Sequence, residues 1–388
     1  MKEVKKINII NKKINMNSLL FFSAYAFFII SSFIGESTLS LIIPDSLGKM
    51  LQVLGIMLLG LKFFRDKYSY RELLFYIISL SLLIIYFLFS GSYDVILFFT
   101  LVLAVRNIDF DLVVRFFFLL VLFLLSLVMV LAILKFVPNY TSIRPTGIPR
   151  MALGTSYPTV LGAYWFYLSC CLVFIFRRSK SVILFFLLVL IGLFVNYVAD
   201  SRAAMMLIFL LALIQLLTII NDKVFFRFIY HIRFVIIALL ITFNFLSVLL
   251  PYMYQRMPTN LATFLNTLLS NRLVLGNQAF NTYPINFFGN DIIVNGYGNG
   301  QILSYGEKYF YIDTLNIWLL FFKGITALVA YVSLFFTNIL KILKNRKIIL
   351  FLLLSLITLF DFVDNKSFRL SYSPFMLFLF ADTKKEEL

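Results

Sequence analysis

The chain has 388 residues, of which 62% are hydrophobic and 13% are charged, whereas about a quarter of the residues in soluble domains are charged. Its 47 Phe residues and its long Leu- and Ile-rich stretches exceed what one globular core can bury, which excludes a soluble protein. Because lipid cannot hydrogen-bond the backbone and the apolar stretches do not alternate with period two, the sequence predicts an all-α, polytopic membrane protein. The formal net charge of +16 then reflects membrane topology and not nucleic-acid binding.

About 12 transmembrane helices are predicted, since about 20 apolar residues cross the hydrocarbon core of a bilayer. In chain order they are expected over 18–34, 47–64, 72–90, 92–105, 112–136, 158–176, 181–199, 203–220, 234–250, 313–340, 348–363 and 371–381. The fourth and the last of these are short for a span. Residues 1–388 are expected to form a single transmembrane helical domain.

Lys and Arg gather in alternate connections between these spans. The clusters lie at 62–71, 106–115, 177–180, 223–233 and 341–347. Since short basic loops favour the cytoplasmic side, we expect a multi-pass protein of the cytoplasmic (cell) membrane with both termini in the cytoplasm. The lysine-rich N-terminus is expected to precede an uncleaved first helix, because no small-residue cleavage site follows it.

Two connections on the predicted outer side are long, the loop over 138–157 and the large outer loop over 251–312, between spans 9 and 10. Long ordered loops on a helical scaffold usually carry function. Within the second loop, apolar residues recur at helical spacing between Pro258 and Ser270. This pattern predicts an interfacial helix that lies along the membrane surface.

Arginines on the predicted outer side oppose the topological bias and are therefore candidates for ligand binding. They are Arg144, Arg150, Arg202, Arg256 and Arg272. A guanidinium group matches a phosphate with two parallel donors, so these residues indicate anion recognition, with a lipid-linked diphosphate as the expected anion. For each of them the alternative is a side chain that reaches water from a helix end, and for Arg202 it is also a structural pair with Asp200.

The large outer loop contains a string of glycines that alternate with Tyr and Asn. The string is Gly296, Tyr297, Gly298, Asn299 and Gly300, and acidic Glu307 and Asp313 follow it. Glycine lets the backbone approach a ligand closely, and Tyr and Asn beside carboxylates suit sugar hydroxyls. A plain flexible turn is the alternative interpretation.

The sequence predicts no metal and no cofactor. His231 is the only histidine and lies in a predicted cytoplasmic cluster, so neither a zinc site nor a Ser-His-Asp site is expected on the outer side. Cys170 and Cys171 are adjacent within an apolar span, which supports neither a disulfide nor a metal site.

In layout and in several short strings the chain resembles the Wzy-type polysaccharide polymerases, which belong with the O-antigen ligases to one superfamily. The matching strings are Arg144-Pro-Thr-Gly147 with Arg150 and Gly154, Ser201-Arg202, Asn271-Arg272, Gly296/Gly298/Gly300, and Asp313 followed by Gly324. The chain has Tyr157-Pro158-Thr159 where many members have His-Pro-Asn. It also has no outer-loop histidine such as the ligase branch uses, which favours a polymerase over a ligase.

The resemblance implies a metal-independent, lipid-linked (GT-C-like) glycosyltransferase. Such an enzyme joins undecaprenyl-diphosphate-linked oligosaccharide repeat units into O antigen, capsule or exopolysaccharide at the outer face of the membrane, by transfer of the growing chain to a lipid-linked acceptor unit. A chain-length regulator protein is the further partner that the resemblance implies. Carried onto this sequence, Arg202, Arg272, Asp313 and Glu307 would be catalytic. Arg144, Arg150, Arg256 and the string from Gly296 to Gly300 would bind diphosphate and sugar, with Asp291 as a further acidic candidate.

Two other functions are compatible with a multi-span protein. A lipid-linked oligosaccharide flippase, or another transporter of the pathway, usually shows related halves and charged residues at mid-bilayer, and neither is evident in the sequence. A multi-span sugar acyltransferase generally needs a histidine or comparable base, and the predicted outer side has no histidine.

Overall fold

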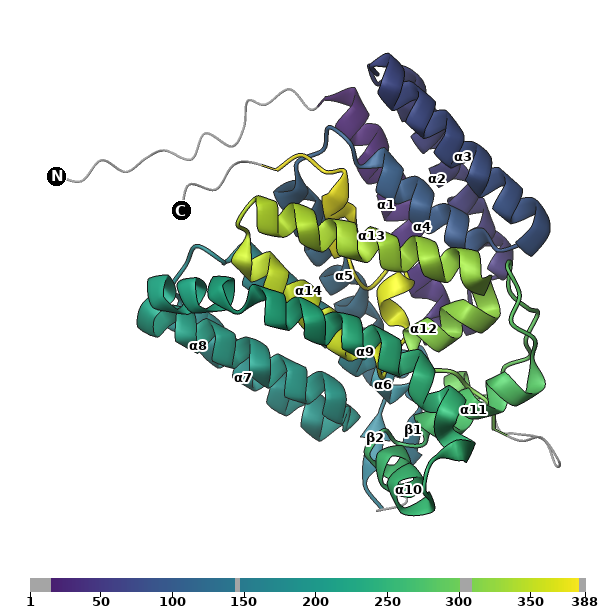
Figure 1. The fold of residues 1–388 in the computed structure, drawn as a ribbon, viewed down its shortest axis with the longest axis vertical. Helices are drawn as coiled ribbons and strands as arrows, with labels where there is room; N and C mark the ends of the chain where they lie inside the picture. The colour runs from purple at the N-terminus through teal and green to yellow at the C-terminus, as the bar shows by residue number, and fades with distance from the viewer. Residues whose placement is uncertain (1–14, 144–146, 301–308, 384–388) are drawn as a thin grey trace.

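The computed structural model describes residues 15–143, 147–300 and 309–383, which form a bundle of helices (Figure 1). Among these residues, nine helices are long and apolar enough to cross a bilayer. They are α1 (Met16–Gly35), α2 (Asp45–Arg65), α3 (Tyr70–Ser90), α5 (Phe110–Ile133), α6 (Pro158–Ile175), α7 (Val182–Phe194) with a π-helical turn to Ala199, α8 (Arg202–His231), α9 (Arg233–Met253), and α12 (Leu315–Trp318) joined by a π-helical turn to α13 (Gly324–Lys344). Two shorter apolar helices, α4 (Tyr93–Ala104) and α14 (Ile348–Asp361), accompany them. The prediction of an all-α polytopic membrane protein is confirmed.

Local sequence explains where several of these helices begin, bend and end. Ser69 and Glu72 form a capping box at the start of α3, which satisfies two backbone donors that the first turn leaves free. Gly91 ends the same helix with a φ of 63°, a conformation that glycine adopts without strain. α8 continues beyond the predicted end at 220, bends at Asn221 (φ −157°, ψ 89°) and reaches His231.

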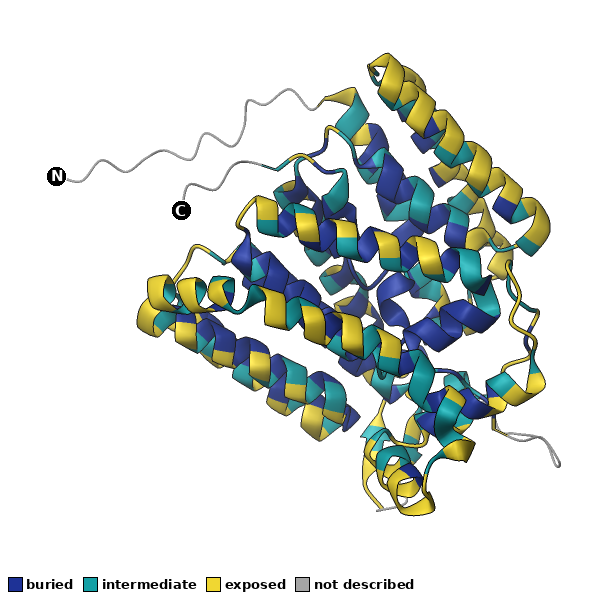
Figure 2. Ribbon diagram, in the orientation of Figure 1, coloured by how far each residue is buried: buried dark blue, intermediate teal, exposed yellow. Residues whose placement is uncertain are grey.

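The centre of the bundle is buried and its outside is exposed (Figure 2), and many of the exposed residues are large and apolar. Within an 18-residue apolar stretch of each helix, 83% of the residues of α6 are buried and 11% of those of α3. α6 is therefore central and α3 is peripheral. On α3, Leu82 and Ile84 are 61% and 60% exposed. Apolar faces of this extent do not stay in water on a soluble monomer, and we therefore assign the exposed faces to contact with lipid.

The two ends of the bundle differ in composition. The loop end carries the antiparallel hairpin of β1 (Thr141–Ile143) and β2 (Pro149–Met151) together with α10 (Thr259–Leu268) and α11 (Arg272–Thr282) (Figure 1). α10 forms within the segment predicted to be helical, and its location along a membrane surface stays a prediction. The opposite end, here the basic end, corresponds to the predicted cytoplasmic side.

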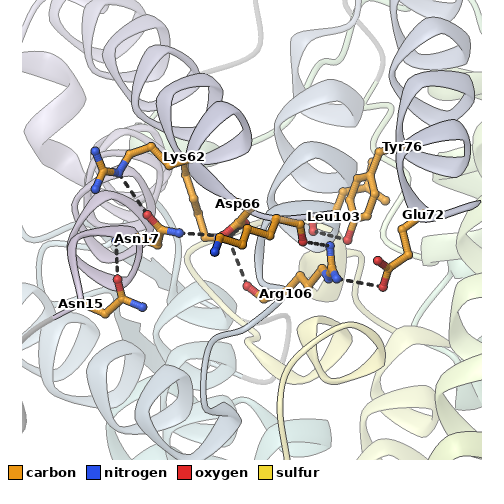
Figure 3. Close-up of polar contacts among 10 residues, drawn as sticks. Asn15, Asn17, Lys62, Asp66, Glu72, Tyr76, Leu103 and Arg106 are labelled. Atoms are coloured by element: carbon orange, nitrogen blue, oxygen red, sulfur yellow. Dashed lines mark hydrogen bonds and ion pairs between the residues drawn. The ribbon is translucent and has the colours of Figure 1, made fainter. Parts of the chain in front are cut away.

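A polar network holds four helices together at the basic end (Figure 3). The buried Lys62 pairs with the Asp66 carboxylate and donates to the Arg106 carbonyl at 3.1 Å. Arg106 pairs with Glu72 at 2.8 Å, and Asn17 donates to Asp66 at 2.7 Å. Because a buried ammonium is costly without a partner, this network fixes the start of α1 and the C-terminal ends of α2 and α4 against the start of α3.

The segment after α14 departs from the prediction of a twelfth helix over 371–381. It contains only short 3-10 turns, Lys366–Phe368 and Phe375–Leu379. The Ser371 hydroxyl lies 2.9 Å from that of Ser32, near the C-terminal end of α1. The Asp382 N–H donates to the Ile108 carbonyl at 2.8 Å, just before α5 begins at the basic end. The segment therefore runs between both ends of the bundle without an α-helix, and the prediction of a helix there is wrong.

Side chains of α13 replace the missing helical hydrogen bonds of this segment. Lys341 donates to the carbonyls of Phe378 and Leu379 at 3.1 and 2.8 Å, and Asn338 donates to that of Met376 at 3.1 Å. Irregular backbone at membrane depth is stable only where protein supplies such partners. Hydropathy alone cannot separate a lipid-facing helix from an irregular segment that is buried in protein.

Candidate functional site

A buried carboxylate, Glu36, lies at the loop end directly after α1. The Lys366 ammonium is 3.1 Å from its Oε2 atom, Arg369 contacts its Oε1 atom, and the Tyr372 hydroxyl donates to Oε2 at 3.0 Å. The side chains of Glu36 and Lys366 are only 5% and 7% exposed. Because burial of an ion is costly unless it is paired and hydrogen-bonded, these groups depend on one another for their charged states.

The chain after α14 carries a second carboxylate into this group. The Asp364 Oδ1 atom accepts the Lys366 N–H at 2.9 Å, so Asp364 stands at the start of the turn that presents the Lys366 ammonium. Asn365 donates to the Ile312 carbonyl at 2.8 Å, and Thr314 donates to the Phe362 carbonyl at 3.2 Å. These two bonds align residues 362–365 with residues 312–314 and bring Asp313 close to Asp364.

Arg272 joins the group from the large loop. One of its terminal nitrogens lies 3.5 Å from Asp313 Oδ2, and its Nε donates to the Val363 carbonyl at 2.8 Å. Another nitrogen donates to the Leu269 carbonyl at 3.2 Å, after the end of α10. We call Glu36, Arg272, Asp313, Asp364, Lys366 and Arg369 the loop-end cluster.

Two carboxyl groups of the loop-end cluster, those of Asp364 and Asp313, are easier to protonate than free carboxyl groups because they are buried. Burial raises the pKa of Asp364 to about 7, with a further increase from Asp313, while Lys366 and Arg272 oppose the shift. Burial also raises the pKa of Asp313, while the charges of Arg272 and Lys366 lower it. The Asp313 side chain is 31% exposed. A carboxyl group with a pKa near neutrality can accept and release a proton at physiological pH.

Lys366 remains charged between these acids. Burial by itself would lower the pKa of the Lys366 ammonium, but neighbouring Tyr311, Asp364 and Asp313 raise it beyond its ordinary value. The cluster therefore keeps a fixed cation beside an acid of variable charge, which is an arrangement that can bind an anion and move a proton.

Arg150 lies beside this cluster on the hairpin. Its Nε donates to the Ser142 hydroxyl at 3.2 Å, and a terminal nitrogen donates to the Tyr157 hydroxyl at 2.8 Å. Burial raises the pKa of Tyr309, and the charges that act on this residue include Asp313, Tyr157 and Arg272. Tyr309 is therefore near both Tyr157, which accepts a hydrogen bond from Arg150, and the Asp313–Arg272 pair of the loop-end cluster.

The glycine-containing string packs against the first loop. The Asn299 N–H donates to the Ser156 carbonyl at 2.8 Å, and the Asn299 side chain donates to the Ser40 hydroxyl at 3.1 Å. Gly300 has a φ of 70°, and a Cβ atom there would lie 2.2 Å from the Tyr140 ring. The end of this string is thus a packed turn, and the two predicted outer loops meet.

Other members of the string contribute ring contacts. The Tyr297 ring stacks on that of Tyr309 with centroids 5.2 Å apart, and Gly296 lies against the Tyr311 ring. Around Gly298, a Cβ atom would meet nothing within 4 Å. Stacked tyrosines near acids suit the faces and hydroxyls of sugar rings.

The remaining predicted site residues are placed elsewhere or lie outside the description. Arg202 is 57% exposed and lies 3.9 Å from Asp200, and Arg256 is exposed beside the Tyr252 ring. Within the described ranges, neither arginine has a hydrogen bond or ion pair to the loop-end cluster. Arg144 and Glu307 lie outside the described residues. The catalytic roles of Arg202 and Glu307 and the substrate-binding roles of Arg144 and Arg256 stay predictions.

Sequence reasoning missed four members of the loop-end cluster: Glu36, Asp364, Lys366 and Arg369. The sequence does indicate three of them, because charged residues between Asp361 and Arg369 interrupt the apolar C-terminal stretch. This interruption falls on the predicted outer side. These four residues lie in short connections between predicted spans, whereas the predicted site residues lie mainly in the two long outer loops.

Fold and site together define a helical, multi-span membrane protein with a buried cluster of acids and cations at one end. Comparisons with family models, with curated proteins and with solved structures find no match to this chain. The chemistry of the loop-end cluster and the resemblance in short motifs are therefore the grounds for a functional proposal.

Proposed function

We propose that the protein is a GT-C-like glycosyltransferase that polymerises undecaprenyl-diphosphate-linked oligosaccharide repeat units into surface polysaccharide. The reaction takes place at the outer face of the cytoplasmic membrane, on the loop end. The observation that carries the proposal is the position of the Arg272 guanidinium, which lies 3.5 Å from Asp313 and donates to the Val363 carbonyl at 2.8 Å. The next residue, Asp364, has a carboxyl group whose pKa burial raises to about 7. A cation for the leaving diphosphate and a base for the acceptor hydroxyl are what this transfer requires.

In the proposed reaction, a hydroxyl oxygen of the acceptor unit attacks the anomeric carbon of the donor sugar. The bond between that carbon and the diphosphate oxygen breaks, and undecaprenyl diphosphate leaves with the electron pair. The carboxylate of Asp364 accepts the proton of the hydroxyl. Lys366 and Glu36 are positioning residues, because they hold Asp364 through the turn that Lys366 begins.

Arg272 is suited to bind the diphosphate leaving group because its ion pair with Asp313 is long. The 3.5 Å separation from Asp313 and the 20% exposure of its side chain leave the guanidinium accessible to a phosphate from the loop end. Arg150 offers a second guanidinium, which a tyrosine hydroxyl and a serine hydroxyl hold in place. Fixed donors at developing negative charge are worth about 10²–10³-fold in rate.

Lipid-exposed apolar faces support a substrate that carries a prenyl chain. A donor and an acceptor that are both anchored in the membrane reach the loop end by lateral diffusion, and only their diphosphates and sugars must enter the polar region. The tyrosines of the large loop, Tyr297 and Tyr309 among them, would contact the sugars.

A lipid-linked oligosaccharide flippase is the second candidate, and two observations favour it. A π-helical turn and Gly324 interrupt the last long span, and residues 369–382 run through the bundle without an α-helix. Broken helices of this kind are frequent in transporters. The chemistry of the loop-end cluster is nevertheless better explained by group transfer.

The test is the fate of lipid-linked glycans in a strain that lacks the gene. A polymerase deletion leaves single repeat units exposed on the outer side, whereas a flippase deletion retains them inside. Arg272→Ala should fail to restore polymer, and Arg115→Ala, an exposed arginine at the basic end, should restore it. Retention of the units inside the cell in the deletion strain would contradict the proposal and favour the flippase.

A further inference from the structure

A cavity of about 730 Å³ lies at the basic end, far from the loop-end cluster. It is formed where three connections meet: the turn after α6, the bend of α8, and the turn between α13 and α14. Its charged lining residues are Arg177, Arg178, Lys180, Asp222, Lys223, Arg227, Arg346 and Lys347. Seven of these eight residues are cationic, so the cavity favours a negatively charged ligand.

The bend of α8 presents one helical face to this cavity. Asp222, Lys223, Phe226, Arg227 and Tyr230 line it, and their spacing follows the period of a helix. Between them, Val224 and Phe228 belong to the exposed apolar residues. The break at Asn221 therefore produces an amphipathic helix end, with its cations toward the cavity and its apolar side chains outward, as in helices that lie at a membrane interface.

The cations of the cavity exceed the carboxylates that could neutralise them. Lys180 pairs with Asp222 at 2.9 Å, and Arg177 pairs with Asp111 at 2.9 Å. Within the described part of the chain, neither Arg227 nor Arg346 has a carboxylate at ion-pair distance; Arg346 instead lies 6.0 Å from the centre of the Tyr230 ring. The preference of basic residues for cytoplasmic loops explains why these Arg and Lys residues lie at the basic end. It does not explain why three separate connections contribute them to the same cavity.

We infer that this cavity binds the headgroup of an anionic phospholipid from the leaflet at the basic end. The cations would hold the phosphodiester, and the apolar part of the lining, with Phe174, Phe226 and Ile349, would contact the glycerol and the first acyl carbons. The cavity lies at the ends of α6, α8, α13 and α14, which is the depth of the headgroups in a bilayer. Basic pockets between membrane helices on this side are suited to such lipids.

The test compares lipids on the purified full chain in detergent, with affinity measured by native mass spectrometry or by thermal shift. Phosphatidylglycerol should bind about 30-fold more tightly than phosphatidylcholine. Arg227→Gln/Arg346→Gln should reduce this preference to less than threefold. The matched control, Arg71→Gln/Arg115→Gln, removes two exposed arginines at the same end and should keep the preference.

Three outcomes would overturn the inference. Equal binding of the two lipids would do so, as would an unchanged preference in the Arg227→Gln/Arg346→Gln variant with an unchanged unfolding temperature without lipid. Displacement of phosphatidylglycerol by millimolar inorganic phosphate would assign the cavity to a soluble anion instead. None of these results depends on polymerase activity, because the cavity and the loop-end cluster are at opposite ends of the bundle.

Discussion

Replacement of Glu36 by Gln tests whether the buried charges of the loop end depend on one another. The change keeps the shape of the side chain and removes its charge, so that Lys366 and Arg369 lose their common counterion. Removal of one member of a buried ion pair typically costs about 3–5 kcal/mol. The lower limit, about 3 kcal/mol, applies here, because Asp364 stays near Lys366 and the Gln oxygen still accepts the Tyr372 hydroxyl.

The assay is thermal unfolding of the purified protein in detergent, followed by tryptophan fluorescence. The chain has two tryptophans, and Trp318 lies near the Phe368 ring beside the cluster. Glu72→Gln is the matched control, since Glu72 pairs with Arg106 at the surface of the basic end with a side chain that is 43% exposed, and water already solvates it. A loss of stability in Glu36→Gln no greater than that in Glu72→Gln would refute the claim that the Glu36 charge is buried and paired.

The remaining predictions concern catalysis and the loops. Arg272→Ala should lower the rate of polymer formation by about 10²–10³-fold in an assay of membranes with labelled lipid-linked units, and a rate within threefold of wild type would exclude Arg272 from the reaction. Since the raised pKa of Asp364 is about 7, activity should increase as the pH rises through 7 and the carboxylate forms, and Asp364→Asn should abolish that increase. Because burial raises the pKa of Asp364 in the folded state, ionisation of this group opposes folding. The unfolding free energy should therefore fall as the pH rises from about 4 to about 7. Asp364→Asn should weaken the pH dependence of thermal unfolding over this interval. Gly300→Ala should speed proteolysis of the large loop, because Gly300 has a positive φ and a Cβ atom there would collide with the Tyr140 ring. Gly298→Ala should not, since the space around its Cβ position is open. Equal rates of proteolysis in the two variants would refute this packing.

The sequence was sufficient for the spans that hydropathy and length define. α1, α3 and α6 begin and end within a few residues of the predicted limits, because their continuous apolar stretches are bounded by polar or charged residues. It was also sufficient to place Arg272 and Asp313 among the candidates, since Arg272 lies in the large outer loop and Asp313 directly follows it, and the structure brings them to 3.5 Å.

The rest depends on contacts between distant parts of the chain. No local pattern reveals that Glu36 pairs with Lys366, because more than 300 residues separate them. The irregular path of residues 369–382 depends on side-chain donors of α13 such as Lys341 and Asn338, which a hydropathy plot scores only as polar residues in another span. The helical end of α8 was missed because its charged residues were interpreted as a loop.

The most direct measurement uses the purified protein in lipid vesicles, supplied with the single lipid-linked repeat units that a deletion strain accumulates. If the account is correct, the wild-type protein will convert them to products of two or more units and release one undecaprenyl diphosphate for each bond formed, and Arg272→Ala will not. Movement of intact units across the vesicle membrane, without elongation and without release of the carrier, would contradict it.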